Sequence, residues 1–113
     1  DGERTVLPSH MVPPFGLVLH ELATNAAKHG ALSTLDGRVD VHWAPADDGA
    51  VNVRWIEHGG PPVVEPTGHG LGLRLVRGLI EHEIDGDVRM RFEPDGFVCE
   101  MRLPHRAARE ATA

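Results

Sequence analysis

The 113 residues are enough for one domain with a single hydrophobic core. A formal net charge of -6 argues against nucleic-acid binding, which normally needs a basic face, although a local phosphate site stays possible. The single cysteine, Cys99, excludes an intrachain disulfide framework and is typical of a reducing compartment, so we expect a cytoplasmic protein.

No apolar run approaches the roughly 20 residues of a membrane span, so we expect no membrane segment in this chain. No secretory leader is recognisable either. The sequence opens on DGERTVLP without an initiating methionine. We therefore expect it to be a segment of a longer protein.

The first half of the chain predicts a short edge strand at residues 5–7, then a helix and a hairpin. Pro13 and Pro14 suit a helix start, because a first-turn residue has no intrahelical partner for its N–H. We expect this helix over residues 14–29, ending at Gly30 in the left-handed conformation. The PADDG turn lies between two runs that alternate with the period of a strand: Val39, Val41, Trp43 and Val51, Val53, Trp55.

The second half begins with GGPPVVEPTGHG, whose glycines and prolines predict a loop. Apolar residues at helical spacing then predict a helix over 71–82, and two strands over 87–92 and 97–103 flank a PDG turn. We expect one domain over residues 1–104 and a flexible tail over 105–113. The order predicts an α+β two-layer sandwich, with the helices on one face of a mixed, mostly antiparallel sheet.

The stretch HELATNAAKHG carries a polar trio on the first helix. With Glu21 set at zero, Asn25 lies near +40° and Lys28 near -20°, while the apolar side chains lie on the opposite side. A solvated outer face would explain this pattern. However, asparagine is a mediocre helix former. A carboxylate, an amide oxygen and an ammonium on one face also suit a hydrated Mg²⁺ and a polyphosphate.

Two further patterns are ambiguous when each is taken alone. GHGLGL, at residues 68–73, directly precedes the second predicted helix, where glycines and free N–H groups suit a phosphate. A plain loop-to-helix junction would explain it equally. WIEHGGP ends a strand in Glu57, followed by Gly59. Glu57 is either an exposed strand end or a carboxylate that accepts a hydrogen bond from an exocyclic amine such as that of adenine.

Taken together and in this order, the patterns resemble the GHKL superfamily of ATP-binding domains, which includes gyrase-type and histidine-kinase ATPases. That family carries an N box, E-x-x-x-N-A-x-K, then D-x-G-x-G, then G-x-G-L-G-L. The resemblance covers about residues 5–103 and implies the Bergerat-type ATP-binding fold, with ATP and Mg²⁺ as cofactors. Here the N box spans residues 21–28.

The resemblance implies a role for each matching residue. Asn25 would ligate Mg²⁺, Glu21 would hold a metal-bound water or assist proton transfer, and Lys28 would face phosphate oxygens. Glu57 would take the adenine amine with Gly59 beside it. The glycine box would bring backbone N–H groups to the nucleotide at Gly68, Gly70, Leu71 and Gly72.

Within the superfamily the match is closest to the HWE group of bacterial sensor histidine kinases, marked by a histidine before the N-box glutamate and by W-x-E. These are His20 and Trp55-Ile56-Glu57. We expect Trp43 and Trp55 themselves to lie mainly in the core. Glu57 replaces the usual aspartate, a feature shared by the group, and His29 stands where tyrosine is common. The segment over residues 61–67 is much shorter than most ATP lids, so we expect weaker or faster-exchanging nucleotide binding.

The resemblance implies a kinase that transfers the γ-phosphate to a histidine on a separate dimerisation domain, which then passes it to a response regulator. The whole protein would be homodimeric. None of the eight histidines is expected to be the phosphoacceptor, and no Cys/His cluster has zinc spacing. Two alternatives stay open: a serine kinase of the anti-sigma-factor type, and a degenerate docking module that does not bind ATP.

Overall fold

The computed structural model of the chain describes residues 7, 9–46, 48–61 and 71–104. A 3₁₀ turn at Ser9–Met11 leads into helix α1, Val12–His29, and helix α2 spans Leu71–Gly78. A second 3₁₀ turn, Ala31–Ser33, follows α1, and a π-helical turn, Leu79–Glu83, continues α2. The strands are β1 (Arg38–Pro45), β2 (Val51–His58), β3 (Asp87–Glu93) and β4 (Gly96–Leu103).

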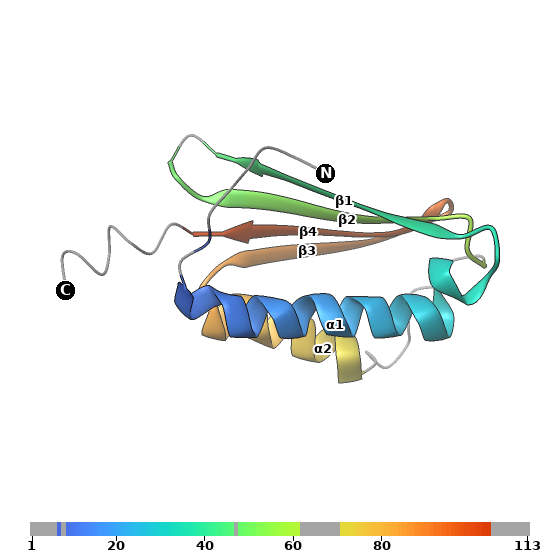
Figure 1. Cartoon of the computed structure of the whole chain (residues 1–113), viewed down its shortest axis with the longest axis horizontal. Coiled ribbons are helices and arrows are strands. Elements are labelled where there is room, and N and C mark those ends of the chain that lie inside the picture. The colour runs from blue at the N-terminus through green and yellow to red at the C-terminus, as the bar shows by residue number, and fades with distance from the viewer. Residues whose placement is uncertain (1–6, 8, 47, 62–70, 105–113) are drawn as a thin grey trace.

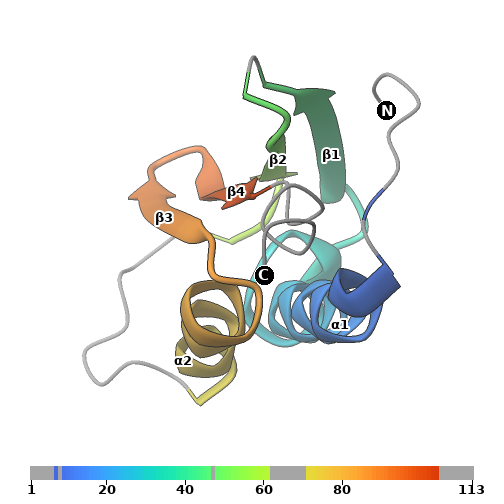
Figure 2. The ribbon, with the colours of Figure 1, turned by 90° about the vertical axis from the view of Figure 1, so that its left-hand side faces the viewer.

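The four strands form one sheet in the order β1-β2-β4-β3, and every pair is antiparallel. Both helices cover the same face of this sheet (Figures 1 and 2), with α1 toward β1 and α2 toward β3. The predicted α+β two-layer sandwich is confirmed. The predicted strand over 5–7 falls mostly outside the described residues, and Leu7 itself is not in a strand.

The sheet builds its buried face by simple alternation. Along β2, Val51, Val53, Trp55 and Glu57 are buried, while the residues between them are exposed or half-buried. Two such strands joined by the turn at residues 46–50 make the first hairpin, in which Gly49 takes a positive φ of 86°. The predicted hairpins around PADDG and PDG are both confirmed.

The core lies between the helices and the sheet. Helix α1 contributes the fully buried Val18, Leu22 and Ala26. The prediction that the apolar side chains of α1 lie opposite the polar trio is confirmed, because Phe15, Leu19 and Ala23 also pack, partly buried, against the same cluster. Further members come from the turn before α1, from the second helical segment and the residue after it, and from the sheet: Met11, Val76, Ile80, Ile84, Trp55, Phe97, Cys99, Met101 and Leu103.

Two details of the helix ends differ from the prediction. Helix α1 begins at Val12, two residues early, with Pro13 and Pro14 inside its first turn. The left-handed conformation predicted for Gly30 is wrong, since its φ is -122° and its ψ -146°. A glycine is needed there for space, because a Cβ at Gly30 would lie 2.1 Å from the Glu57 Oε1 atom.

The second helix changes from α-helical to π-helical hydrogen bonding before it ends. Its α-helical part stops at Gly78, four residues before the predicted end, and the π-helical turn carries the chain to Glu83. The N–H of Ile84 donates to the carbonyl of Leu79 at 2.9 Å, which is the five-residue spacing of a π turn. Throughout the described residues, no helix is both long enough and apolar enough to cross a membrane.

Candidate functional site

The side-by-side packing of α1 and α2 (Figure 2) brings Gly72, from the last predicted motif, next to the first predicted motif. A Cβ placed on Gly72 would lie 3.0 Å from the Asn25 Nδ2 atom and 3.1 Å from the Glu21 Oε1 atom. Gly72 therefore stands directly against the polar face of α1. Residues 47 positions or more apart in the sequence thus share one site.

Asn25 has an unusual environment at this contact. Its Nδ2 atom is buried and has no hydrogen-bond partner within the described part of the chain. Buried amides are nearly always paired, so this NH₂ group calls for an acceptor such as a phosphate oxygen or a water. The Oδ1 atom of Asn25 and the half-buried carboxylate of Glu21 are the hard oxygen ligands that Mg²⁺ accepts. The donor set therefore fits a magnesium-bound phosphate.

The three residues of the polar trio differ in their exposure to solvent. Glu21 and Asn25 are half-buried beside α2, whereas Lys28 is exposed on the last turn of α1. The first turn of α2 offers backbone N–H groups without intrahelical partners, which suit an anion. Gly68, Gly70 and all of the predicted lid over 61–67 except Pro61 lie outside the described residues, and so does the side chain of Leu71.

Glu57 is the second feature of the site, and it is not the exposed strand end that the sequence left open. The residue is only 5% exposed. Its Oε1 atom accepts a hydrogen bond from the backbone N–H of Ala31 at 3.0 Å. Its Oε2 atom accepts one from the indole Nε1–H of Trp55 at 2.9 Å. A buried carboxylate with a donor on each oxygen is held in one orientation.

The loop after α1 is hydrogen-bonded to the loop after β2 next to Glu57. The Thr34 hydroxyl donates to the carbonyl of Gly59 at 2.9 Å. Gly59 has a positive φ of 73°, and a Cβ there would lie 2.8 Å from the carbonyl oxygen of Asp36. A Cβ on Gly60 would lie 2.7 Å from the Cα atom of Ala31. The glycines of the GGP stretch therefore allow the two loops to touch.

The sequence analysis missed both donors to Glu57. A backbone N–H such as that of Ala31 leaves no signal in residue type. Trp55 could have been found from the sequence, because residues at i and i+2 of a strand point to the same face and Trp55 is therefore a neighbour of Glu57. The prediction that Trp55 lies in the core is confirmed, since it is 5% exposed, whereas Trp43 is only half-buried.

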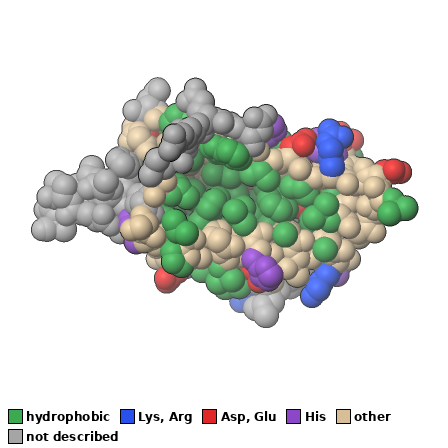
Figure 3. All heavy atoms as spheres, in the orientation of Figure 1, with side chains coloured by type: hydrophobic (Ala, Val, Ile, Leu, Met, Phe, Trp, Pro, Cys, Tyr) green, Lys and Arg blue, Asp and Glu red, His purple; other side chains and the backbone are tan. Residues whose placement is uncertain are grey.

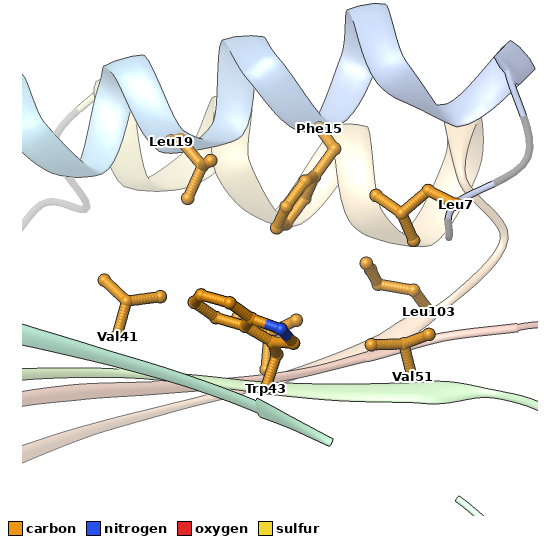
Figure 4. Close-up of a pocket in the computed structure, with 8 residues that line it drawn as sticks. Leu7, Phe15, Leu19, Val41, Trp43, Val51 and Leu103 are labelled. Atoms are coloured by element: carbon orange, nitrogen blue, oxygen red, sulfur yellow. The ribbon is translucent and has the colours of Figure 1, made fainter. Parts of the chain in front are cut away.

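An apolar hollow lies elsewhere, between the first half of α1 and the sheet (Figures 3 and 4). Its volume is about 210 Å³. Figure 4 shows Phe15 and Leu19 facing Trp43 across it. No charged side chain and none of the predicted site residues line it, so it offers nothing to a phosphate. The lining consists of Leu7, Phe15, Leu19, Val41, Trp43, Val51, Val53 and Leu103.

Displaced pKa values occur away from the site. Burial raises the pKa of the Cys99 thiol to about 12, so this cysteine stays protonated and unreactive at neutral pH. The guanidinium of Arg102 beside Asp48 holds the pKa of that carboxyl below its usual value. His58 lies 3.0 Å from Asp40, so the histidine after Glu57 points to an acid on β1.

Comparison with known proteins decides the family. Residues 12–107 match the model of the histidine kinase-, DNA gyrase B- and HSP90-like ATPases. The chain belongs to this family. The match runs across α1, α2 and all four strands.

Individual proteins similar to this ATPase domain include histidine kinases. A blue-light-activated histidine kinase of Rhizobium johnstonii is 35% identical over 105 residues, which are 92% of this chain and 30% of that protein. The solved blue-light activated histidine kinase of Erythrobacter litoralis EL346 is similar in fold, with a TM-score of 0.79 at 19% identity over 96% of this chain and 35% of that one.

A second solved structure is the histidine kinase ThkA in complex with the response regulator protein TrrA. It has a TM-score of 0.60 at 25% identity, over 80% of this chain and 28% of that one. The chain spans only 30%, 22% and 29% of the length of three curated relatives that it matches. What those whole proteins do is therefore a matter for proposal.

Proposed function

We propose that this ATPase domain is the catalytic, ATP-binding part of a sensor histidine kinase, and that it binds Mg-ATP and presents the γ-phosphate to a histidine on a separate dimerisation domain. One observation carries the proposal. The buried and unpaired amide of Asn25 stands with Glu21 against Gly72, at the N-terminus of a helix. Oxygen ligands for a metal and N–H groups for a phosphate meet there.

At the phosphate end, Asn25 is the proposed Mg²⁺ ligand and Glu21 holds a metal-bound water or assists proton transfer. The exposed Lys28 adds positive charge for the phosphate oxygens. Backbone N–H groups complete the phosphate site at Gly68, Gly70, Leu71 and Gly72. Catalysis then consists of positioning and charge neutralisation, which is how phosphoryl transfer is generally accelerated.

At the base end, Glu57 is the proposed acceptor for the adenine amine, with Gly59 beside it. The carboxylate keeps acceptor capacity after its hydrogen bonds to Trp55 and Ala31, because each oxygen has a second lone-pair site. The W-x-E pattern and His20 before the N box support membership of the HWE group.

The partners follow from the reaction. The dimerisation domain with the phosphoacceptor histidine would lie in the remainder of the protein, which we propose is a cytoplasmic homodimer. The names of the curated relatives and the ThkA–TrrA complex support a response regulator as the downstream partner. Neither serine-kinase activity nor a nucleotide-free docking role is favoured by any described feature.

Titration calorimetry with Mg-ATP tests the binding step. We expect the wild-type chain to bind Mg-ATP, and Asn25→Ala to weaken the affinity by about tenfold or more, since even indirect partners of a metal site are worth that much. Asn52→Ala is the matched control, because Asn52 is exposed on β2. Its affinity should equal that of the wild type.

Two results would contradict this proposal. The first is the absence of any Mg-ATP binding by the wild-type chain, which would leave the docking-module alternative. The second is an Asn25→Ala variant that is folded and binds Mg-ATP as tightly as Asn52→Ala. Affinity that does not change when Mg²⁺ is removed would argue against Asn25 as a metal ligand in particular.

A further inference from the structure

Trp55 and Glu57 form a hydrogen-bonded pair on the buried face of β2. The two residues are neighbours on the same side of the strand, and each is 5% exposed. The indole Nε1–H lies 2.9 Å from the Glu57 Oε2 atom. An indole can only donate and an ionised carboxylate can only accept, so the direction of this bond is unambiguous.

The opposite oxygen of Glu57 is fixed independently. The N–H of Ala31 donates to Oε1 at 3.0 Å. That N–H is itself held in place, because Ala31 opens a 3₁₀ turn whose Ser33 hydroxyl donates to the carbonyl of Gly30 at 2.6 Å. With one rigid donor on each oxygen, the plane of the carboxylate is defined.

The backbone at the end of α1 lies against this side chain. A Cβ on Gly30 would lie 2.1 Å from Oε1, so the end of α1 touches the carboxylate. The end of α1 and the two hydrogen-bond donors therefore surround the carboxylate of Glu57.

We propose that Trp55 is a positioning residue that sets the base specificity of this domain: its indole N–H orients the Glu57 carboxylate to accept a hydrogen bond from the exocyclic amine of a 6-aminopurine. The inference rests on the proposed function, since it assumes that Glu57 faces the base. A fixed carboxylate rejects a 6-oxopurine, whose carbonyl oxygen would oppose it with a second acceptor. A carboxylate free to turn away loses that discrimination.

The test compares Mg-ATP with Mg-ITP, which carries a 6-oxo group in place of the amine, by calorimetry. We expect the wild type to prefer Mg-ATP, and Trp55→Phe to reduce the ratio of the two affinities by about tenfold, since hydrogen bonds to charged groups are strong. Trp43→Phe is the matched control, because it removes an indole from β1 in the apolar hollow, and its ratio should stay at the wild-type value.

A second variant keeps the test valid if Trp55→Phe fails to fold. Replacement of Trp55 by 3-benzothienylalanine keeps the ring shape and substitutes sulfur for the N–H. The same loss of preference is expected. A purely structural role for Trp55 would lower both affinities equally and leave their ratio unchanged, and that result would overturn the inference.

The two proposals fail in different ways. A wild-type chain that binds neither nucleotide would overturn the proposed function and this inference with it. A wild-type chain that binds Mg-ATP and prefers it over Mg-ITP, while both Trp55 variants retain that preference, would overturn only the role of Trp55.

Discussion

Glu57 shows how a single buried charge can be tolerated in so small a domain. A carboxylate removed from water is costly unless it is hydrogen-bonded, and here both oxygens have a donor. Both donors are neutral, and one of them is a backbone N–H. The residue is therefore a structural tie between β2 and the loop after α1 as well as a candidate base contact.

Replacement of Glu57 by glutamine should reveal this structural contribution. The amide has one acceptor oxygen, so either Trp55 or Ala31 would face an NH₂ group and lose its partner. We expect Glu57→Gln to lower the free energy of unfolding by about 1–3 kcal/mol, as measured by urea denaturation. Glu93→Gln, at an exposed position on β3, should cause little change. Equal stabilities for the two variants would contradict the hydrogen-bonding scheme.

At the same scale, the chemistry of side chains was predictable and the contribution of the backbone was not. Glu21, Asn25 and Glu57 stood out because acids and amides are unusual in otherwise apolar elements. The N–H of Ala31 could not be found, because every non-proline residue carries one. Gly30 was assigned a helix-ending conformation, but its real constraint is the nearby carboxylate, which comes from a residue 27 positions further along the chain.

At the scale of elements, the helices and strands followed from apolar periodicity, while their ends did not. The π-helical turn after α2 has no periodic signature in the sequence. The apolar spacing therefore predicted an ordinary helix through residue 82. Gly72 lies at the contact between α1 and α2. Its missing side chain lets the first turn of α2 approach Glu21 and Asn25.

Two glycines of α2 provide a matched pair of tests. A Cβ at Gly72 would press on Asn25 at 3.0 Å, so Gly72→Ala should displace that amide and weaken Mg-ATP binding by about tenfold, by analogy with other supporting partners of metal sites. A Cβ at Gly78 would meet nothing within 4 Å. Gly78→Ala should keep the affinity and raise stability by about 0.5–1 kcal/mol.

Calorimetry and urea denaturation of both variants provide the measurement. If Gly72→Ala binds Mg-ATP as tightly as Gly78→Ala, then the close approach of α2 to Asn25 is not part of the nucleotide site. The comparison is internal, because both substitutions add the same methyl group to the same helix.

At the scale of the whole molecule, the fold holds the two halves of the proposed nucleotide site at fixed positions relative to one another. The packing of α1 and α2 on one face assembles the oxygen and amide groups of Glu21 and Asn25 with Gly72, while β2 delivers Glu57 against the loop after α1. Motif order predicted this assembly through resemblance to a family. The geometry of α1 alone could not predict it, because Gly72, the neighbour of Asn25, belongs to a helix that is far along the sequence.

The prediction of fast nucleotide exchange through a short lid remains a prediction, because residues 62–70 are outside the described part of the chain. The same holds for the flexible tail over 105–113. The family match over residues 12–107 covers both helices and all four strands.

Phosphorylation of the intact protein by ATP labelled on the γ-phosphate tests the central claim most directly. We predict incorporation of label that is acid-labile and alkali-stable, as expected of a phosphohistidine, and that is lost in Asn25→Ala but retained in Asn52→Ala. Acid-stable label on a serine of another protein, or no label in a protein that binds Mg-ATP, would contradict the account.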